Sequence, residues 1–411
     1  MRKSINSLII GAGKEQIYFI KEAKKLGINI IALDESPIAE GLNFVDIPIV
    51  IDIKDEKRVI EIAKKYNINF VIPAPIGNLI TLTGVVNNAL KLKGSSKNQA
   101  EIFANKDKFT EFKIKNGFYN PKEFLLNSPN NDEIKNIIEK NNSDFILRPS
   151  KGSGSRGVVV IKKTYKEDKK ISLIDEHLNS LIQDEISLIS EFVTGKEYGV
   201  DIFISDEIYI LSIREKIMTK LPYRQEVGFI INNNSKIKSL IKNQFLKLAN
   251  ILNLNNTFFH ADVIINKSNV FIIEASPRPA GLDIYKNLLG KYYKKSIVQE
   301  CMKKLIDENH TIDLSKEEYK QLGFFMWDIP NKTIKKKSDF SQIDDIIDFE
   351  FNLSLGEKIP TIKKGSDINK YGYFILKSDT KKDLKKLDYN QNNIQIIFFK
   401  ILVLSGLIST L

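Results

Sequence analysis

The first hundred residues alternate short apolar runs with amphipathic segments, and this alternation constrains the fold more than any other feature. Apolar runs at 5–10 and 28–33 predict buried strands, while the segments at 17–26 and 55–66 have the spacing of amphipathic helices. Strands that alternate with helices are typical of a parallel sheet with helices on its faces. We therefore expect an α/β domain over residues 1–100.

The turn after the first strand, Gly11-Ala12-Gly13, suggests a dinucleotide-binding motif, and Asp34 follows about 20 residues later. That motif also requires Gly or Ala at its third position, where this chain has Gln16. A tight turn in a doubly wound sheet accounts for the glycines without a ligand. We expect this structural role rather than NAD binding.

Composition excludes several classes of protein. The chain has 411 residues, 42% of them hydrophobic and 27% charged, so it can bury a core. The net charge is +11, but the lysines are scattered and no nucleic-acid module is recognisable, so we expect a lysine-rich surface with general affinity for anions and no nucleic acid. A negatively charged small substrate is the alternative explanation of the charge. The single cysteine, Cys301, excludes an internal disulfide and fits a cytoplasmic protein.

Neither end of the chain predicts export or a membrane anchor. The apolar run near the N-terminus is too short for a secretory signal. The last residues, 394–411, are nearly all apolar and close to the length that spans a bilayer, but Lys400 lies in the middle of the run. We expect a docked C-terminal helix or strand there rather than a membrane span.

A loop of small residues lies between predicted strands at 145–147 and 158–161. It reads Arg148-Pro149-Ser150-Lys151-Gly152-Ser153-Gly154-Ser155-Arg156-Gly157. Its backbone N–H groups could line a phosphate chain between two arginines, which bind phosphate oxygens in a fork geometry. A mobile hairpin tip is the alternative. The loop does not match the phosphate loop that ends in Gly-Lys-Ser/Thr before a helix.

Two acids are expected to face each other on a second hairpin. The strands at 259–265 and 270–274 bring Asp262 and Glu274 to paired positions. Two close carboxylates repel, and Mg²⁺ is commonly held by one or two carboxylates together with substrate phosphates. Acids on an exposed sheet face are the alternative explanation.

Taken in order, these motifs resemble the ATP-grasp superfamily over about residues 5–310. The matching segments are Asp107-Lys108, the loop from Arg148 to Gly157, the segment from Glu191 to Glu197, and Asp262 with Glu274-Ala275-Ser276-Pro277-Arg278. The resemblance implies an α/β fold in four parts. These are a Rossmann-like pre-ATP-grasp domain (1–100), two α+β ATP-grasp subdomains (101–189 and 190–312), and a small C-terminal subdomain with an apolar tail (313–411).

The resemblance also implies roles for individual residues, with ATP and Mg²⁺ as cofactors. The residues that would contact the phosphates are Lys108, Arg148, Ser153, Gly154, Ser155 and Gly157. Those that would contact adenine and ribose are Glu191, Phe192, Val193 and Glu197. Asp262, Glu274 and Ser276 would hold Mg²⁺, and Arg278 would stabilise an acyl phosphate. Two positions depart from the family pattern: Arg148 stands where Lys is usual, and Ser276 where Asn is usual.

The implied activity is a ligase that activates a small-molecule carboxylate as an acyl phosphate and joins it to an amine, releasing ADP and phosphate. Amino acids are candidate substrates. Two alternatives stay open: carboxylation or formylation of a nucleotide-pathway metabolite, and a non-enzymatic nucleotide-binding module. His260, on the strand face of Asp262, is a candidate catalytic residue, with a structural histidine as the alternative. The acceptor site has three candidates, Lys216, Arg224 and Glu226, which are otherwise exposed loop charges, and Asp283 is a candidate for binding the amine. Homodimers are common in the superfamily, but the sequence does not fix the oligomeric state.

Overall fold

The computed structural model describes residues 5–127, 129–151, 154–183, 185–317, 321–328, 331, 333–334, 344–379 and 384. The chain forms two compact units. Unit 1 comprises residues 1–117, 198–213 and 232–318, and unit 2 comprises residues 118–197, 214–231 and 319–411. The apolar tail at 394–411 lies outside the described residues, and the domain boundaries at residues 100, 189 and 312 remain predictions.

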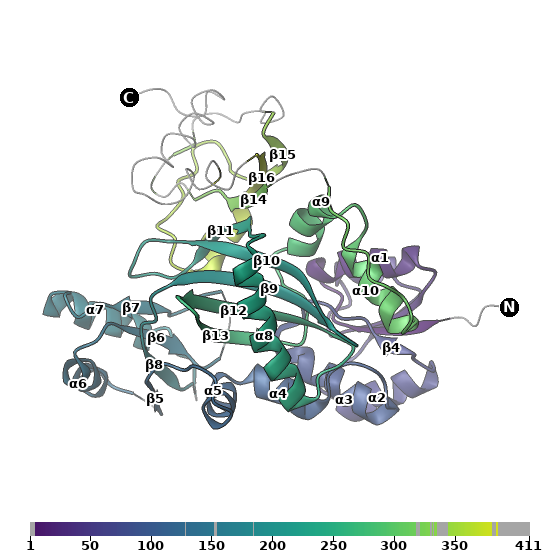
Figure 1. Cartoon of the computed structure of the whole chain (residues 1–411), viewed down its shortest axis with the longest axis horizontal. Helices are drawn as coiled ribbons and strands as arrows, with labels where there is room; N and C mark the ends of the chain where they lie inside the picture. Colours follow the sequence, from purple (N-terminus) through teal and green to yellow (C-terminus); the bar gives the residue numbers. More distant parts are fainter. Residues whose placement is uncertain are drawn as a thin grey trace. The chain divides into compact units, whose positions relative to one another are not determined.

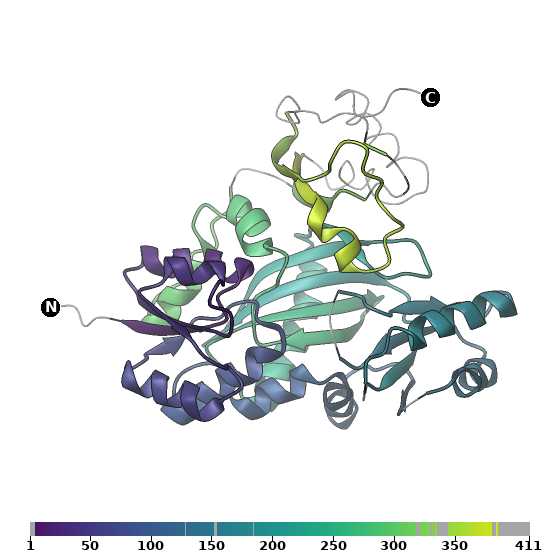
Figure 2. The same cartoon turned by 180° about the vertical axis from the view of Figure 1, so that it is seen from behind.

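Unit 1 begins with the predicted parallel sheet. Its strand order is β3-β2-β1-β4, and every neighbouring pair is parallel. The strands are β1 (Asn6–Ile10), β2 (Asn29–Asp34), β3 (Ile47–Val50) and β4 (Phe70–Val71). The helices of this region are α1 (Ile17–Lys25), α2 (Glu56–Lys65), α3 (Ile80–Leu90), α4 (Lys97–Ala104) and α5 (Lys106–Lys115). Helix α1 lies on one side of the sheet, and α2 and α3 lie on the other (Figures 1 and 2).

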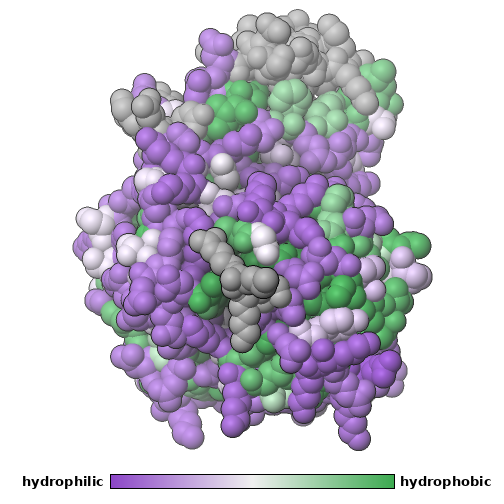
Figure 3. Space-filling view, turned by 90° about the vertical axis from the view of Figure 1, so that its right-hand side faces the viewer, coloured by the Kyte–Doolittle hydropathy of each residue, from purple (hydrophilic) through white to green (hydrophobic). Residues whose placement is uncertain are grey.

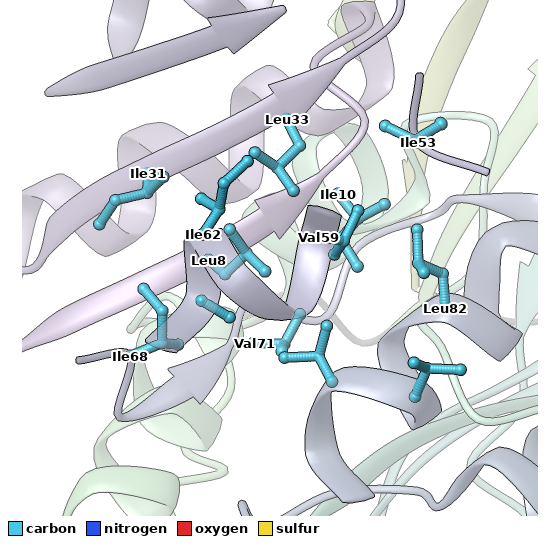
Figure 4. Close-up of a cluster of buried hydrophobic side chains, with 13 residues drawn as sticks. Leu8, Ile10, Ile31, Leu33, Ile53, Val59, Ile62, Ile68, Val71 and Leu82 are labelled. Atoms are coloured by element: carbon cyan, nitrogen blue, oxygen red, sulfur yellow. The ribbon is translucent and has the colours of Figure 1, made fainter. Parts of the chain in front are cut away.

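Side-chain alternation along β1 explains this packing. Leu8 and Ile10 point to one face, where they join Val59 and Ile62 of α2 in a buried cluster (Figure 4). Each such side chain contributes roughly 1.5–3 kcal/mol when fully buried. Asp55 starts α2 by accepting a hydrogen bond from the backbone N–H of Arg58.

The rest of unit 1 is built on antiparallel strands. Strands β12 (Thr257–Asn266) and β13 (Asn269–Ser276) form the predicted hairpin, followed in the sheet by β9 (Lys196–Ile204) and the first half of β10 (Ile208–Met218). The helices are α8 (Ser235–Leu252), α9 (Gly290–Tyr292), α10 (Ile297–Ile306) and a π-helix, η4 (Tyr285–Leu289). Phe245 of α8 packs against Phe259 of β12, with ring centroids 5.8 Å apart.

Unit 2 contains a four-stranded antiparallel sheet in the order β5-β8-β6-β7. The strands are β5 (Glu123–Leu126), β6 (Phe145–Pro149), β7 (Val159–Ile161) and β8 (Ser187–Glu191), and the helices are α6 (Asn131–Asn141) and α7 (Glu167–Leu178). Phe145, Ile174 and Ile189 lie in its core. The small-residue loop joins β6 to β7, so the predicted hairpin is confirmed.

A second antiparallel group completes unit 2. The latter half of β10 pairs with β11 (Glu226–Ile231), and β14 (Gln321–Met326), β16 (Gly372–Ser378) and β15 (Ile346–Phe351) follow in that order. Trp327 is buried against Phe351 and Phe374. Two short 3-10 helices, η6 (Gly365–Asp367) and η7 (Asn369–Tyr371), precede β16.

In the part of the chain that the structure describes, no helix is both long enough and apolar enough to cross a bilayer. The face drawn in Figure 3 is largely hydrophilic, and its hydrophobic side chains lie in small patches. Scattered patches of this kind are ordinary on a protein surface.

Candidate active site

The first glycine turn is filled by the protein itself. The backbone N–H of Ala12 donates to Asp34 Oδ2 at 2.6 Å, so the acid of the apparent dinucleotide motif holds the turn. The N–H of Gly41 donates to the carbonyl of Ala12, and a Cβ at residue 41 would lie 2.6 Å from that oxygen. These contacts favour the structural role that we expected for Gly11 and Gly13.

The second glycine loop, in unit 2, has an unusual backbone. Gly154, Ser155 and Gly157 have φ angles of 66°, 55° and 65°, in the left-handed region. Left-handed residues that alternate with right-handed ones, or that lie in tight turns, can turn successive backbone N–H groups towards an anion. Ser153, which we assigned to the phosphates, lies outside the described residues, as does Gly152.

Neighbouring segments of unit 2 hold this loop. Arg156 forms a salt bridge with Glu185 at 2.8 Å. The carbonyl of Gly154 accepts the N–H of Gly365 at 2.9 Å, and Ser155 Oγ donates to the carbonyl of Arg224 at 2.8 Å. Arg156 therefore has a structural partner within its own unit.

His177 fixes the end of the loop. Burial lowers the pKa of His177 and favours the neutral imidazole. Nδ1 lies 2.7 Å from the carbonyl of Gly157, which can only accept, so Nδ1 carries the proton. Nε2 then accepts from Ser187 Oγ, also at 2.7 Å. A cavity of about 310 Å³ adjoins the loop and is lined in part by Ser155, Glu176, Tyr223 and Lys363.

Arg148 is nearly buried and already paired. Its guanidinium donates to Glu123 Oε1 at 2.7 Å and to Ser190 Oγ at 3.1 Å. Glu123 comes from β5, which no motif marked. Sequence reasoning therefore found the cation and missed the acid that positions it.

The segment between β8 and β9 carries the predicted adenine and ribose contacts. The backbone N–H of Phe192 donates to the carbonyl of Asp144 at 2.8 Å, and Ser143 Oγ donates to the carboxylate of Glu191 at 3.3 Å. The structure therefore uses the Phe192 N–H to hold this segment in place. Val193 follows directly in the same segment.

Three charged residues of unit 2, Lys216, Arg224 and Glu226, gather around Glu197. Arg224 lies 2.5 Å from its carboxylate, and Lys216 Nζ lies 3.5 Å away. Lys216 also contacts Glu226 at 2.7 Å. Sequence analysis named Glu197 and these three residues as candidates, and the structure brings the four together. We call these four residues, together with Arg148 and residues 154–157, the loop cluster.

In unit 1 the hairpin β12–β13 aligns the predicted metal ligands. Asp262 pairs with Glu274, and His260 pairs with Ser276, so the predicted pairing of the two acids is confirmed. Two carboxylates and a hydroxyl form an oxygen donor set that suits Mg²⁺. Among the described residues there is no group of three or more His, Cys, Asp or Glu side chains able to hold a metal. Mg²⁺ commonly binds one or two carboxylates and keeps water or phosphate oxygens as its other ligands.

Arg278 and His260 adjoin these acids. The N–H of Arg278 donates to the carbonyl of Ser276 at 2.8 Å, so the chain turns directly after β13. His260 Nε2 lies 3.7 Å from Asp262 Oδ1. His260, Asp262, Glu274, Ser276 and Arg278 are called the hairpin cluster below.

Lys108 lies apart from the hairpin cluster in sequence, near the start of α5 in unit 1. Its side chain is 52% exposed, and its Nζ lies 3.8 Å from Glu101 Oε2. An exposed pair at this distance holds the lysine weakly, so the side chain can reorient.

The chain matches two family models. Residues 8–92 match the PylC-like N-terminal domain, and residues 141–285 match the ATP-grasp domain. The second match includes the glycine loop and the hairpin β12–β13, and it confirms the fold expected from the motifs.

Known relatives agree with this assignment of the fold. Tyramine–L-glutamate ligase of Methanocaldococcus jannaschii is 30% identical over 158 residues, which is 38% of this chain and 47% of that protein. The chain thus matches about half the length of that relative. Formate-dependent phosphoribosylglycinamide formyltransferase of Prochlorococcus marinus is 22% identical over 66% of this chain and 69% of that protein. The crystal structure of L-amino acid ligase from Bacillus licheniformis superposes with a TM-score of 0.72, at 14% identity, over 98% of both chains.

Proposed function

The chain contains an ATP-grasp domain behind a PylC-like N-terminal domain, and we propose that it is an ATP-dependent ligase of the cytoplasm that joins a small-molecule carboxylate to an amine. The observation that carries this proposal is the cross-strand pair of Asp262 and Glu274, followed at once by Arg278. Two facing carboxylates offer oxygen ligands to Mg²⁺, and the adjoining guanidinium suits a phosphorylated anion. Tyramine–L-glutamate ligase, by its name, joins an amine to an amino acid.

The reaction solves a chemical problem that the residues can address. A carboxylate is a poor electrophile, so one of its oxygens first attacks the γ-phosphorus of ATP, and the bond from that phosphorus to ADP breaks. The amine nitrogen then attacks the acyl carbon, phosphate leaves, and the nitrogen loses a proton. Positioning and neutralisation of charge supply most of the acceleration in phosphoryl transfer.

We assign the residues as follows. Lys108, Arg148, Ser153, Gly154, Ser155 and Gly157 contact the phosphates. Glu191 and Val193 contact adenine through the backbone, beside Phe192, and Glu197 accepts from ribose hydroxyls. Asp262, Glu274 and Ser276 hold Mg²⁺, which when bound offsets the negative charge of the phosphates. Arg278 stabilises the acyl phosphate and the oxyanion that forms when the amine attacks.

A second candidate function rests on the formyltransferase relative. Its name places formate and a phosphoribosylglycinamide among its substrates, and both activations begin with a carboxylate. Formate or bicarbonate would then replace the larger acid. The two functions differ in the acid that triggers ATP consumption.

The test is release of ADP and phosphate from ATP with Mg²⁺, across a panel of amino acids and other carboxylates, each with and without amines. The panel includes L-glutamate with tyramine, together with formate and bicarbonate. Release that needs one acid–amine pair, with the amide detected by mass spectrometry, supports the ligase. Release driven by formate or bicarbonate supports the second function. ATP-induced thermal stabilisation without turnover across the panel contradicts both and favours a binding module.

A further inference from the structure

One buried carboxylate near the hairpin cluster has no part in the proposed reaction. Asp201 lies in the middle of β9 and is fully buried. Its Oδ2 accepts from Ser212 Oγ at 2.9 Å, and its Oδ1 lies 3.3 Å from His260 Nδ1. A buried carboxylate is costly to keep unless such partners compensate for its lost hydration, so these contacts fix its position.

The same carboxylate holds the loop that follows β13. The backbone N–H of Ala280, two residues beyond Arg278, donates to Asp201 Oδ1 at 3.1 Å. Two residues later, the N–H of Leu282 donates to Glu15 Oε1 at 2.8 Å. Two carboxylates from distant parts of unit 1 therefore hold this loop by its backbone.

The shape of the loop requires such support. Leu282 and Asp283 have φ angles of 58° and 50°, in the left-handed region. A side chain other than glycine in this region is strained, and the conformation persists only where its surroundings impose it. The hydrogen bonds from Ala280 and Leu282 lie at this strained segment.

We propose that Asp201, assisted by Glu15, is a positioning residue of the ligase. Its carboxylate sets the place of the loop that carries Arg278, and its Oδ1 lies beside the His260 ring, 3.3 Å from Nδ1. It touches neither substrate nor nucleotide. The inference rests on the proposed function, because its effect on turnover acts through Arg278 and Asp262.

The expected effect is large because reaction rates depend steeply on position. Misplacing a reacting group by about 1 Å can cost about a hundredfold in rate. Mutation of a residue that orients a metal ligand typically lowers metal affinity or activity about 10–100-fold. Asp201 accepts the Ala280 N–H close to Arg278 and lies beside His260, so the effect of its loss on the rate should fall in this range.

The experiment compares Asp201→Ala, Glu15→Ala and Glu15→Gln with the wild type, and Ser212→Ala serves as the matched control. Ser212→Ala removes one hydrogen bond from the same carboxylate and leaves both the loop and His260 in contact with it. Three quantities are measured: deuterium uptake of the peptide spanning residues 276–286, kcat and KM for ATP on the substrates found in the panel, and ATP-induced thermal stabilisation.

We expect Asp201→Ala to raise deuterium uptake in that peptide and to lower kcat about 10–100-fold, with KM for ATP within about twofold of wild type. Glu15→Ala should act in the same direction by a smaller factor. Glu15→Gln should restore wild-type behaviour, because its amide oxygen still accepts the Leu282 N–H. This rescue also decides the question if Asp201→Ala does not fold.

Unchanged uptake in both alanine variants overturns the inference whatever the activity. Loss of kcat that Glu15→Gln fails to rescue, or a parallel rise in KM for ATP, overturns it as well. If the wild type turns over no substrate, the proposed function fails, and deuterium uptake still decides whether the two carboxylates hold the loop.

Discussion

The loop cluster of unit 2 and the hairpin cluster of unit 1 handle charge in opposite ways. In the loop cluster, Arg148 is paired with Glu123 at 2.7 Å, and Arg224 is paired with Glu197 at 2.5 Å. Each cation therefore has an acid that fixes its position before any ligand arrives. Preorganised cations of this kind cost little reorganisation when a phosphate replaces water beside them.

The hairpin cluster instead concentrates acids on neighbouring strands. Asp262 and Glu274 share one register position, and Asp201 lies 3.3 Å from the far side of His260. Like charges so close together are unfavourable without a cation. In the loop cluster, therefore, acids hold the cations in place, whereas in the hairpin cluster facing acids offer oxygen ligands to a cation.

Removing Glu274 should have the largest effect on turnover, and it tests the acids of the hairpin cluster. Glu274 is exposed, so Glu274→Ala should leave the fold intact. Loss of a metal ligand should lower the rate of ADP formation about 10²–10³-fold, equivalent to roughly 3–4 kcal/mol. The rate is measured with saturating Mg²⁺ and the substrates identified in the panel.

Glu61→Ala removes an exposed acid of α2 in the same unit and serves as the control. It should retain the wild-type rate. Turnover by Glu274→Ala within a fewfold of this control would refute the metal assignment and leave the facing acids as ordinary sheet residues.

Replacing Arg148 by Gln tests the loop cluster, in which an acid is paired with each cation. Their side chains are only 10% and 4% exposed, so Arg148→Gln leaves a buried carboxylate without its charged partner. We expect a loss of about 3–5 kcal/mol in the free energy of unfolding, measured by urea titration.

The matched control is the double variant Arg148→Gln/Glu123→Gln, which buries no net charge. It should be more stable than the single Arg148 variant, because two neutral amides can hydrogen-bond to each other. A double variant less stable than the single one would show that the pair does not fix the arginine, and the contrast between the clusters would fail.

Local sequence patterns predicted the elements on which both clusters stand. The hairpin expected at 259–265 and 270–274 is observed as β12 (Thr257–Asn266) and β13 (Asn269–Ser276), because strand periodicity and a polar turn are encoded locally. The pairing of Asp262 with Glu274 followed from the same pattern.

The supporting acids could not be found in this way. Asp201 acts on a backbone N–H 79 residues further along the chain, and Glu123 acts on an arginine 25 residues away. In the sequence each is one acid among 51. Their roles depend on tertiary contacts that no short motif contains.

The left-handed backbone of the glycine loop predicts that adding a side chain there destabilises the protein. A Cβ at residue 157 would lie 1.8 Å from Ser180 Oγ, and φ there is 65°. Gly157→Ala should therefore lower the free energy of unfolding by about 2–4 kcal/mol, from strain and displacement together.

The control variant Gly356→Ala, also in unit 2, measures the cost of a left-handed backbone without a steric collision. Its φ is 79°, but nothing lies within 4 Å of the added Cβ, so it should cost only about 1 kcal/mol. Equal losses in the two variants, measured by the same urea titration, would mean that Ser180 moves aside and that the loop is loosely held.

The smallest effect should appear as a pH dependence of stability through Glu185. Burial tends to raise the pKa of Glu185, but hydrogen bonds from Arg156 and from the backbone N–H groups of Ile182 and Lys151 outweigh it and lower the pKa. Because the folded pKa lies below the unfolded value near 4.5, the stabilisation is complete above that pH and is lost as the pH falls through the folded pKa. Urea titrations between pH 3 and pH 7, as approximate limits of the carboxylate range, should show a steeper acid loss for the wild type than for Glu185→Gln. Parallel curves would mean that the Arg156–Glu185 pair adds no charge-dependent stability, and the loop cluster would then resemble an ordinary set of surface ion pairs.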